Sequence, residues 1–402
     1  MANRAQKEIF EFENIGPIKK AKIELGDLTI FVGPQSSGKT IALELIHLLF
    51  EENYKYISNS IKKSSMFYDK DVFSFLDKYL GENMSSIYNK ENSSIKKNGK
   101  LVTLENLVIN KSYKTGSEKT SNFIPAQRVL MFNRAGGLKV PDDFNNQDPF
   151  VLTDFTQEIR EYLSEKNPNV KKLLNEDRIK LFPNKGSRIF ISEIEDKIAN
   201  SLFKEYSIYL EKTDKLSTRL VLNSENKKSI PFLSWSAGQR EFAPLLLALI
   251  KLHSARKAKD YNLLIVEELE MGLHPDGVMN ALLLILYTIH RGYKVILSSH
   301  SYHLLEFIWY LNQLKDSKLK SKKLELANIF LGENDHSQIV LNAFEKILKM
   351  DYKVYFFDKE DNEVKDITTL DSLHSNPAIA EWGGFNQYSK RMNNSYEKLY
   401  ES

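Results

Sequence analysis

The chain has 402 residues, 42% of them hydrophobic and 27% charged, which is enough for one large core or about two to three domains of a soluble globular protein. The formal net charge of +3 lacks the strong basic excess of a dedicated nucleic-acid binder, although it leaves nucleic acid open as a ligand. The absence of cysteine excludes disulfides and thiolate zinc sites, and no apolar stretch reaches the roughly 18 to 20 residues that span a bilayer. Residues 1–10 also lack the apolar segment of a secretory signal, so we expect a cytoplasmic protein.

The first fifty residues predict three strands and a helix. Apolar residues cluster at 9–12 and 18–25, with Gly16 and Pro17 as the turn of a hairpin between them. Residues 28–32 form a short apolar run between glycines, which is typical of a buried parallel strand. A helical pattern of apolar residues follows Thr40.

Two segments interrupt this pattern. Residues 51–122 are polar, and Asn98-Gly99 within them predicts a type I′ hairpin turn. Residues 141–230 read as an insertion of helices and hairpins, too short for long coiled-coil arms.

The last third returns to regular alternation. Residues 233–300 read as helix, strand, helix, strand, with strands at 263–266 and 295–297. In the tail we expect strands at 329–331 and 353–357, the second paired in a hairpin with 364–367, and a solvated lysine-rich loop over 315–323.

A phosphate-binding loop is the strongest signal in the chain. Residues 33–40 fit the pattern G-x-x-x-x-G-K-[ST] between a predicted strand and a predicted helix. The backbone N–H groups of such a loop surround an anion, and the helix start adds partial positive charge. Lys39 would bridge the β- and γ-phosphates of ATP, and the Thr40 hydroxyl would bind Mg²⁺. The loop residues are Gly33, Pro34, Gln35, Ser36, Ser37, Gly38, Lys39 and Thr40.

Three further segments place chemistry beside this loop. Glu267 and Glu268 follow the strand at 263–266, and we expect the first to hold Mg²⁺ through water and the second to polarise the attacking water. Ser236, Gly238 and Gln239 begin a long helix and would bind phosphate across a dimer interface. His300 ends the strand at 295–297, where it would sense the γ-phosphate.

Together these segments resemble the ABC-type ATPases, and within them the OLD-like group of AAA ATPases related to RecF and SMC proteins. Residues 33–40 resemble Walker A, residues 236–239 the ABC signature, Glu267-Glu268 with residues 273–275 the Walker B and D-loop, and His300 the switch histidine. The opening residues 12–18 also resemble the first hairpin of that group, and Gln127 is our candidate for its Q-loop glutamine.

The resemblance implies a fold and an organisation. It predicts an α/β P-loop ATPase head with a mixed central sheet, an antiparallel β subdomain and a helical insertion. Residues 1–140 would form the first part of the head, residues 141–230 the helical insertion, and residues 231–402 the second part of the head with a C-terminal hairpin.

The resemblance also implies a function. It predicts an ATPase that uses ATP and Mg²⁺, forms a homodimer or larger homo-oligomer around ATP, and controls a protein effector in a bacterial antiphage or toxin–antitoxin-like system. A DNA repair ATPase of the RecF/SMC kind is the alternative, and a transporter subunit is disfavoured by the polar segment 51–122. The acidic residues at 358–361 are only a faint match to a TOPRIM nuclease and read more simply as part of the C-terminal hairpin.

Overall fold

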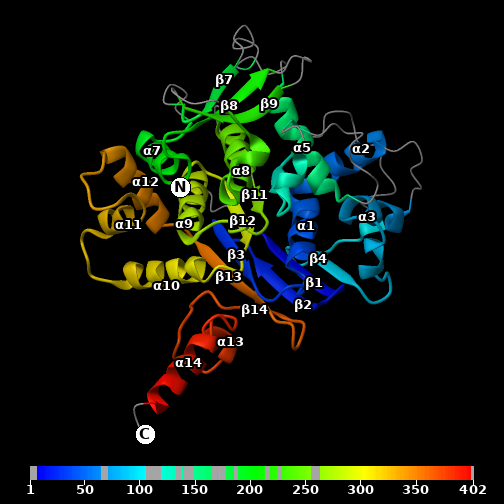
Figure 1. Cartoon of the computed structure of the whole chain (residues 1–402). Coiled ribbons are helices and arrows are strands. Elements are labelled where there is room, and N and C mark those ends of the chain that lie inside the picture. The colour runs from blue at the N-terminus through cyan, green and yellow to red at the C-terminus, as the bar shows by residue number, and fades with distance from the viewer. Residues whose placement is uncertain are drawn as a thin grey trace, which may run out of the picture.

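A six-stranded sheet forms the centre of the molecule (Figure 1). The computed structural model describes residues 7–64, 71–105, 119–132, 137–138, 148–164, 170, 178–184, 189–212, 218–224, 229–254 and 263–399. The strand order is β14 (Val364–Asp366), β13 (Tyr352–Phe357), β3 (Leu28–Val32), β12 (Lys294–Ser298), β11 (Leu263–Val266) and β6 (Ser121–Ile124). Five strands are parallel and the edge strand β14 is antiparallel, which confirms the predicted mixed sheet.

Both faces of this sheet are covered, and the sequence of β3 shows why. All five residues of β3 are buried, as the continuous apolar run predicts. Successive side chains of a strand point to opposite faces, so Ile30 and Val32 join one hydrophobic core and Phe31 joins the other. Each core then needs its own covering layer.

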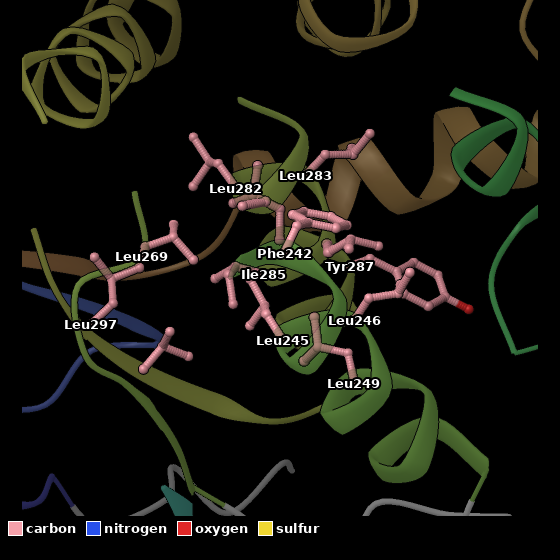
Figure 2. Packing of buried hydrophobic residues seen from close by; sticks show 14 of the residues in the cluster. Phe242, Leu245, Leu246, Leu249, Leu269, Leu282, Leu283, Ile285, Tyr287 and Leu297 are labelled. Atoms are coloured by element: carbon pink, nitrogen blue, oxygen red, sulfur yellow. The ribbon is translucent and has the colours of Figure 1, made fainter. Parts of the chain in front are cut away.

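The first core lies between the sheet and a layer of long helices. Figure 2 shows side chains of α8 (Ala237–Ser254) packing against those of α9 (Pro275–His290). Phe242 is fully buried in this cluster, next to α9 residues such as Ile285. Further helices of this layer are α10 (Tyr302–Asp316), α11 (Lys322–Leu331) and α12 (Gln338–Leu348).

The second core lies under the N-terminal part of the chain. Here α1 (Lys39–Leu49), α2 (Tyr54–Ser64) and α3 (Val72–Leu80) pack with an antiparallel sheet in the order β2-β1-β4-β5. Its strands are β1 (Ile9–Ile15), β2 (Ile18–Glu24), β4 (Ser94–Lys97) and β5 (Lys100–Leu101). The predicted hairpin at Asn98-Gly99 is confirmed, because both residues have the positive φ that a type I′ turn requires, 53° and 75°.

The insertion contains a sheet as well as helices. Four antiparallel strands run in the order β10-β9-β8-β7, and they lie at the top of Figure 1. They are β7 (Arg178–Phe182), β8 (Ser207–Lys212), β9 (Thr218–Asn223) and β10 (Ile230–Pro231). Among its described residues, the helices include α5 (Phe150–Tyr162), α7 (Ser192–Ile198) and a π-helical turn at Ala199–Phe203. The helices and hairpins expected for residues 141–230 are therefore both present, and the description as a helical insertion leaves out this sheet.

The tail departs from the sequence prediction at two places. The predicted strand at 329–331 is wrong, because these residues end α11, whose Leu326, Ala327 and Phe330 are buried at helical spacing. The lysine-rich loop is shorter than predicted, since only residues 317–321 lie between α10 and α11. Lys315 belongs to α10 and donates to the Met350 carbonyl at 2.8 Å.

The hairpin at 352–366 is confirmed, and β13 also pairs with β3 in parallel. Asp358 and Asp361 both pair with Lys365, at 2.7 and 2.6 Å, as expected for a hairpin rather than a metal site. The chain ends in α13 (Pro377–Ala380) and α14 (Gln387–Lys398), which project from the bottom of the molecule in Figure 1. Among the described helices, none combines the length and apolarity that crossing a membrane requires.

Candidate functional site

The loop at 33–40 connects β3 to α1, and two of its glycines are required by its shape. Gly33 has φ 144°, and a Cβ there would lie 2.5 Å from the Phe357 carbonyl oxygen. Gly38 has φ 98°, and a Cβ there would lie 2.6 Å from Cγ1 of Ile18. A larger residue would therefore both strain the backbone and push the loop away from its neighbours.

Lys39 is folded over this loop. Its ammonium donates to the carbonyls of Gly33 and Pro34 at 2.8 Å each, and the side chain is buried. Burial lowers the Lys39 pKa, while the carboxylates of Glu268, Glu270 and Glu267 oppose that shift. The ammonium thus lies between the loop and three acids.

Glu267 connects the loop to two strand ends. The Thr40 hydroxyl donates to Oε1 of Glu267, and the Ala126 N–H donates to Oε2 at 3.2 Å. The position of Glu267 follows from β-pairing, because its own N–H donates to the Ile124 carbonyl of β6 at 2.9 Å. The parallel sheet therefore brings the predicted Mg²⁺ residues together at its carboxyl edge.

This arrangement fits Mg²⁺ in a nucleotide site. Mg²⁺ prefers six oxygen ligands and keeps several waters, so one hydroxyl and one carboxylate are the usual protein share when phosphates supply the rest. Within the described ranges, no three His, Asp or Glu side chains gather into an all-protein metal site. The donor set at Thr40 and Glu267 is thus suited to an ion brought by a phosphate ligand.

Glu268 and His300 face each other next to Lys39. Oε1 of Glu268 lies 3.5 Å from Nε2 of His300, and the Glu268 N–H donates to the Ser298 hydroxyl at 3.0 Å. A hydrogen bond from His300 lowers the Glu268 pKa, burial opposes the shift, and the charge of Lys39 supports it. Glu268 has φ 46°, which is unusual for a residue with a side chain, so neighbouring contacts must hold this turn.

Three further residues at this edge were not predicted from the sequence. The Glu270 carboxylate accepts a hydrogen bond from the backbone N–H of His300. Glu44 is buried in α1, where burial and the charge of Glu267 raise its pKa well above the usual range. Arg128 is fully buried beside the exposed Gln127. The sequence signal that could have identified Arg128 is that it is the one charged residue in the apolar stretch 123–132.

The predicted signature residues lie at the start of α8. The Gln239 N–H donates to the Ser236 hydroxyl at 3.3 Å, and the Ser236 N–H donates to Oε1 of Gln239 at 3.2 Å. These reciprocal bonds form a capping box. Nε2 of Gln239 donates to the Leu202 carbonyl at 2.9 Å, so this side chain already ties α8 to the insertion. Ser236 is exposed, and a Cβ at Gly238 would find only the Gly272 carbonyl nearby, at 3.5 Å.

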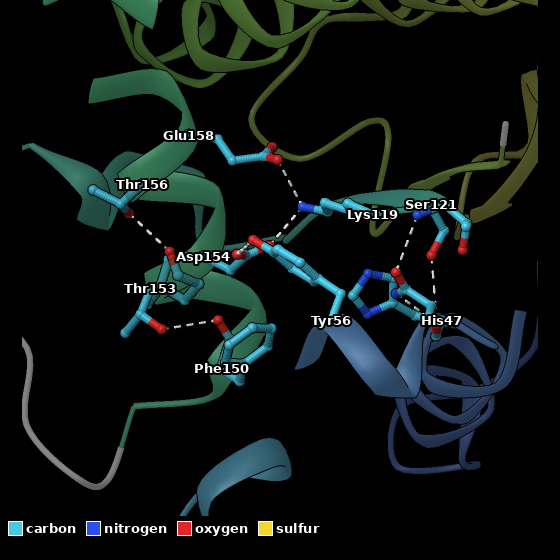
Figure 3. A network of polar contacts seen from close by, with 12 residues as sticks. His47, Tyr56, Lys119, Ser121, Phe150, Thr153, Asp154, Thr156 and Glu158 are labelled. Atoms are coloured by element: carbon cyan, nitrogen blue, oxygen red, sulfur yellow. Dashed lines mark hydrogen bonds and ion pairs between the residues drawn. The ribbon is translucent and has the colours of Figure 1, made fainter. Parts of the chain in front are cut away.

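A buried polar network joins α1, α2 and α5 to the strand β6 (Figure 3). Lys119, just before β6, pairs with Asp154 at 2.5 Å and Glu158 at 2.9 Å, both on α5. The Tyr56 hydroxyl of α2 also donates to Asp154, at 2.7 Å. His47 of α1 is buried, which lowers its pKa to about 3, and its carbonyl accepts from the Ser121 hydroxyl of β6. The network thus links the helix after the loop to the strand that precedes Ala126.

Comparison with known proteins supports a P-loop fold. The family model described as "AAA domain, putative AbiEii toxin, Type IV TA system" matches residues 28–306, from β3 into α10. That range contains residues 33–40, 236–239, 267–268 and 300. Among curated proteins there is no significant match.

The similarity to solved structures is distant. An SMC head bound to the C-winged helix domain of ScpA is 13% identical, with a TM-score of 0.41, over 75% of this chain and 91% of that one. The SMC head domain from Thermotoga maritima is 11% identical, with a TM-score of 0.31, over 75% and 91%. A bacterial Atm1-family ABC exporter with ATP bound is 12% identical, with a TM-score of 0.32, over 77% of this chain and 37% of that one.

The family match covers more than half of the 402 residues and contains every segment of the site described above. The chain therefore belongs to the AAA domain family of P-loop ATPases described as putative AbiEii toxin, Type IV TA system.

Proposed function

We propose that this chain binds ATP with Mg²⁺ between two copies of itself and hydrolyses it, and that this cycle controls a protein effector in a bacterial defence or toxin–antitoxin-like system. One observation carries the proposal. Thr40, Glu267, Glu268 and His300 meet at the carboxyl edge of the sheet, next to Lys39. In this proposal residues 1–140 and 231–402 form the ATPase head, and residues 141–230 form its insertion.

The loop would bind the phosphates. Its backbone N–H groups and the start of α1 supply positive potential, and Lys39 would exchange its two carbonyl acceptors for phosphate oxygens. Gln35 and Ser36 are exposed at the tip of the loop, where they can face the nucleotide. Thr40 and Glu267 would hold the Mg²⁺, which neutralises phosphate charge when bound.

Glu268 would act on the attacking water. Its pKa lies below the usual range, so at neutral pH the carboxylate is ionised and can accept a hydrogen bond from water. His300 would fix the direction of that carboxylate, because its Nε2 faces Oε1 of Glu268. The same imidazole can donate to a γ-phosphate oxygen and so respond to its loss. Gln127, exposed after β6, is our proposed further contact to the nucleotide.

The start of α8 supports a dimer. Ser236 and Gly238 lie at a helix N-terminus, which favours phosphate, and the residues there are exposed or half-buried. Residues 33–40 already supply the phosphate loop of the same subunit, so a second phosphate-binding helix start is useful across an interface. Leu233, 46% exposed just before it, is an apolar contact available to that interface.

The effector is proposed from the family description and the charge. The family description names a putative toxin of a toxin–antitoxin system, and in such a system one component acts on another. The formal net charge of +3 favours a protein partner over a nucleic acid. Purification of tagged Glu268→Gln with ATP from the native host tests this choice. A stoichiometric protein that co-purifies with Glu268→Gln but not with Lys39→Ala supports the proposed effector. Nuclease-sensitive nucleic acid without a protein partner supports instead the alternative function, a DNA repair ATPase.

Phosphate release in steady state tests the ATPase itself. Lys39→Ala should lose nucleotide binding and turnover, and Glu268→Gln should bind ATP without hydrolysing it. Ser236→Arg should be inactive alone but regain part of its activity when mixed with Lys39→Ala, because the mixed dimer contains one intact composite site. Wild-type turnover in Lys39→Ala would refute the site, and no recovery in confirmed mixed dimers would refute the shared interface.

A further inference from the structure

We propose that Arg128 positions Glu268 for hydrolysis and couples it to α8, the helix that begins at the signature. This inference rests on the proposed ATPase function and adds a residue and a link that the motifs do not contain. Arg128 is a positioning residue here, because its recorded contacts are with backbone carbonyls of its own subunit.

The environment of Arg128 is unusual for an arginine. The side chain has 0% exposure, and it is the largest among the fully buried residues of the described chain. A buried guanidinium needs partners for its five N–H donors, otherwise the desolvation of its charge is very unfavourable. Burial lowers the pKa of Arg128, and the carboxylates of Glu241, Glu270, Glu267 and Glu268 oppose that shift. These four acids thus offset part of the cost of burying the cation.

The guanidinium binds three successive backbone carbonyls in the turn at residues 267–269, which we call the catalytic turn. Nη1 donates to the Glu267 carbonyl at 3.3 Å, and Nη2 donates to the carbonyls of Glu268 at 3.5 Å and Leu269 at 3.4 Å. On the other side, the Ser298 hydroxyl and carbonyl accept from the N–H groups of Glu268 and Leu269. These bonds fix a turn in which Glu268 has φ 46°, a strained conformation for a residue with a side chain.

A fourth donor reaches α8. Nε of Arg128 donates to the Glu241 carbonyl at 3.0 Å, in the second turn of the helix that starts next to Ser236. The chain after the catalytic turn packs against the same residue. Gly272 has φ 69°, and a Cβ there would lie 2.6 Å from Cγ of Glu241.

These contacts connect the catalytic turn to the first turns of α8, so the two segments should move together. In the proposed dimer, Glu268 serves the nucleotide of its own subunit, and the start of α8 serves the nucleotide of the other. Movement of α8 against the second nucleotide would therefore shift the Arg128 guanidinium, which holds the carbonyls of Glu267, Glu268 and Leu269. Through Arg128, ATP hydrolysis at one nucleotide site would depend on closure of the other nucleotide site of the dimer.

The test compares Arg128→Gln and Arg128→Lys with a control, Arg291→Gln. Arg291 also donates to a carbonyl, that of Ile189, but it lies at the far end of the 16-residue α9, about 24 Å from the start of that helix. We expect Arg128→Gln to lower kcat about 100-fold with KM changed less than about 3-fold, since a misplaced catalytic group loses rate rather than binding. Arg128→Lys keeps the positive charge but lacks the planar set of guanidinium N–H donors, so its kcat should fall about 10-fold.

A second readout addresses the link to α8. In the Glu268→Gln background, added Arg128→Gln should weaken ATP-dependent dimerisation about 10-fold, while binding of a fluorescent ATP analogue to the monomer stays unchanged. If Arg128→Gln fails to fold, Arg128→Lys carries both measurements. A lysine variant with wild-type kcat and dimerisation overturns the inference, and so does a loss of ATP affinity as large as the loss of kcat.

The wild-type protein separates this inference from the function on which it rests. Wild-type turnover that Lys39→Ala abolishes, together with full activity in Arg128→Gln, refutes only the role of Arg128. A wild-type protein without Lys39-dependent turnover refutes both.

Discussion

Replacing Lys119 by methionine should strongly destabilise the fold. The methionine keeps most of the side-chain length but removes the cation that pairs with Asp154 and Glu158 (Figure 3). The side chains of Lys119 and Asp154 are 12% and 8% exposed, so water cannot replace the lost partner well. Removing one member of a buried ion pair costs about 3–5 kcal/mol.

The pKa of Glu158 gives the same magnitude. Burial alone would raise it, but Lys119 and Lys251 outweigh burial and lower it from 4.5 to about 2. A shift of that size corresponds to about 3 kcal/mol of stability, at about 1.4 kcal/mol per pKa unit. Because the folded pKa is depressed, this stability is present above about pH 4.5 and is lost as pH falls towards 2. Loss of Lys119 should remove part of this acid dependence.

Urea unfolding followed by circular dichroism measures the effect, with Lys7→Met as the control. Lys7 pairs with Glu24, but its side chain is 69% exposed, so its loss should cost less than about 1 kcal/mol. With an unfolding entropy of about 2.1 cal/mol/K per residue, 3–5 kcal/mol lowers the Tm of Lys119→Met by about 4–6 °C. Equal free energies of unfolding in the two variants would show that the buried network does not stabilise the fold.

Three other changes test separate parts of the structure. Gly38→Ala should weaken ATP binding at least about 10-fold by calorimetry, because its φ of 98° and the nearby Ile18 leave no room for a Cβ, whereas Gly99→Ala, with open space around it, should leave affinity unchanged. Phe242→Ala should lower the free energy of unfolding by about 3–5 kcal/mol, and a loss below about 1 kcal/mol would contradict the packing in Figure 2. Burial lowers the His253 pKa to about 3, so the unfolded chain binds an extra proton and stability falls as pH drops from about 6.5 to 3. His253→Gln should flatten that fall in acid titrations of unfolding, and an unchanged slope would contradict it.

Much of the fold could be predicted because its signals are local. The apolar run of β3, the glycines of the loop and the helical pattern after Thr40 follow one another in the sequence, and the structure confirms the elements they predict. The motifs also assigned Thr40 and Glu267 to the same Mg²⁺ ion, and the structure brings these two side chains together.

The errors arose where distant packing decides the structure. Residues 329–331 have the composition of a strand, but the burial of Leu326 and Phe330 against other helices makes them the end of α11. The role of Arg128 depends on carbonyls more than 110 residues later in the chain, and no local pattern reveals which carbonyls a side chain will meet. The hairpins expected in the insertion are present, but the sequence did not reveal that β7 pairs with β8, because α7 lies between them in the chain.

The position of β13 in the sequence sets when its contact with the phosphate loop can form during synthesis. Strand β3 lies between β12 and β13, and the carbonyl of Phe357 touches the position of Gly33. The ribosome adds about 5–20 residues per second, so the roughly 325 residues between the end of β3 and Phe357 take about 15–65 s. Through that interval one edge of β3 has no neighbour. In a nascent chain, the packing of the phosphate loop against Phe357 therefore has to wait until the residues of α8 and the catalytic turn have been made.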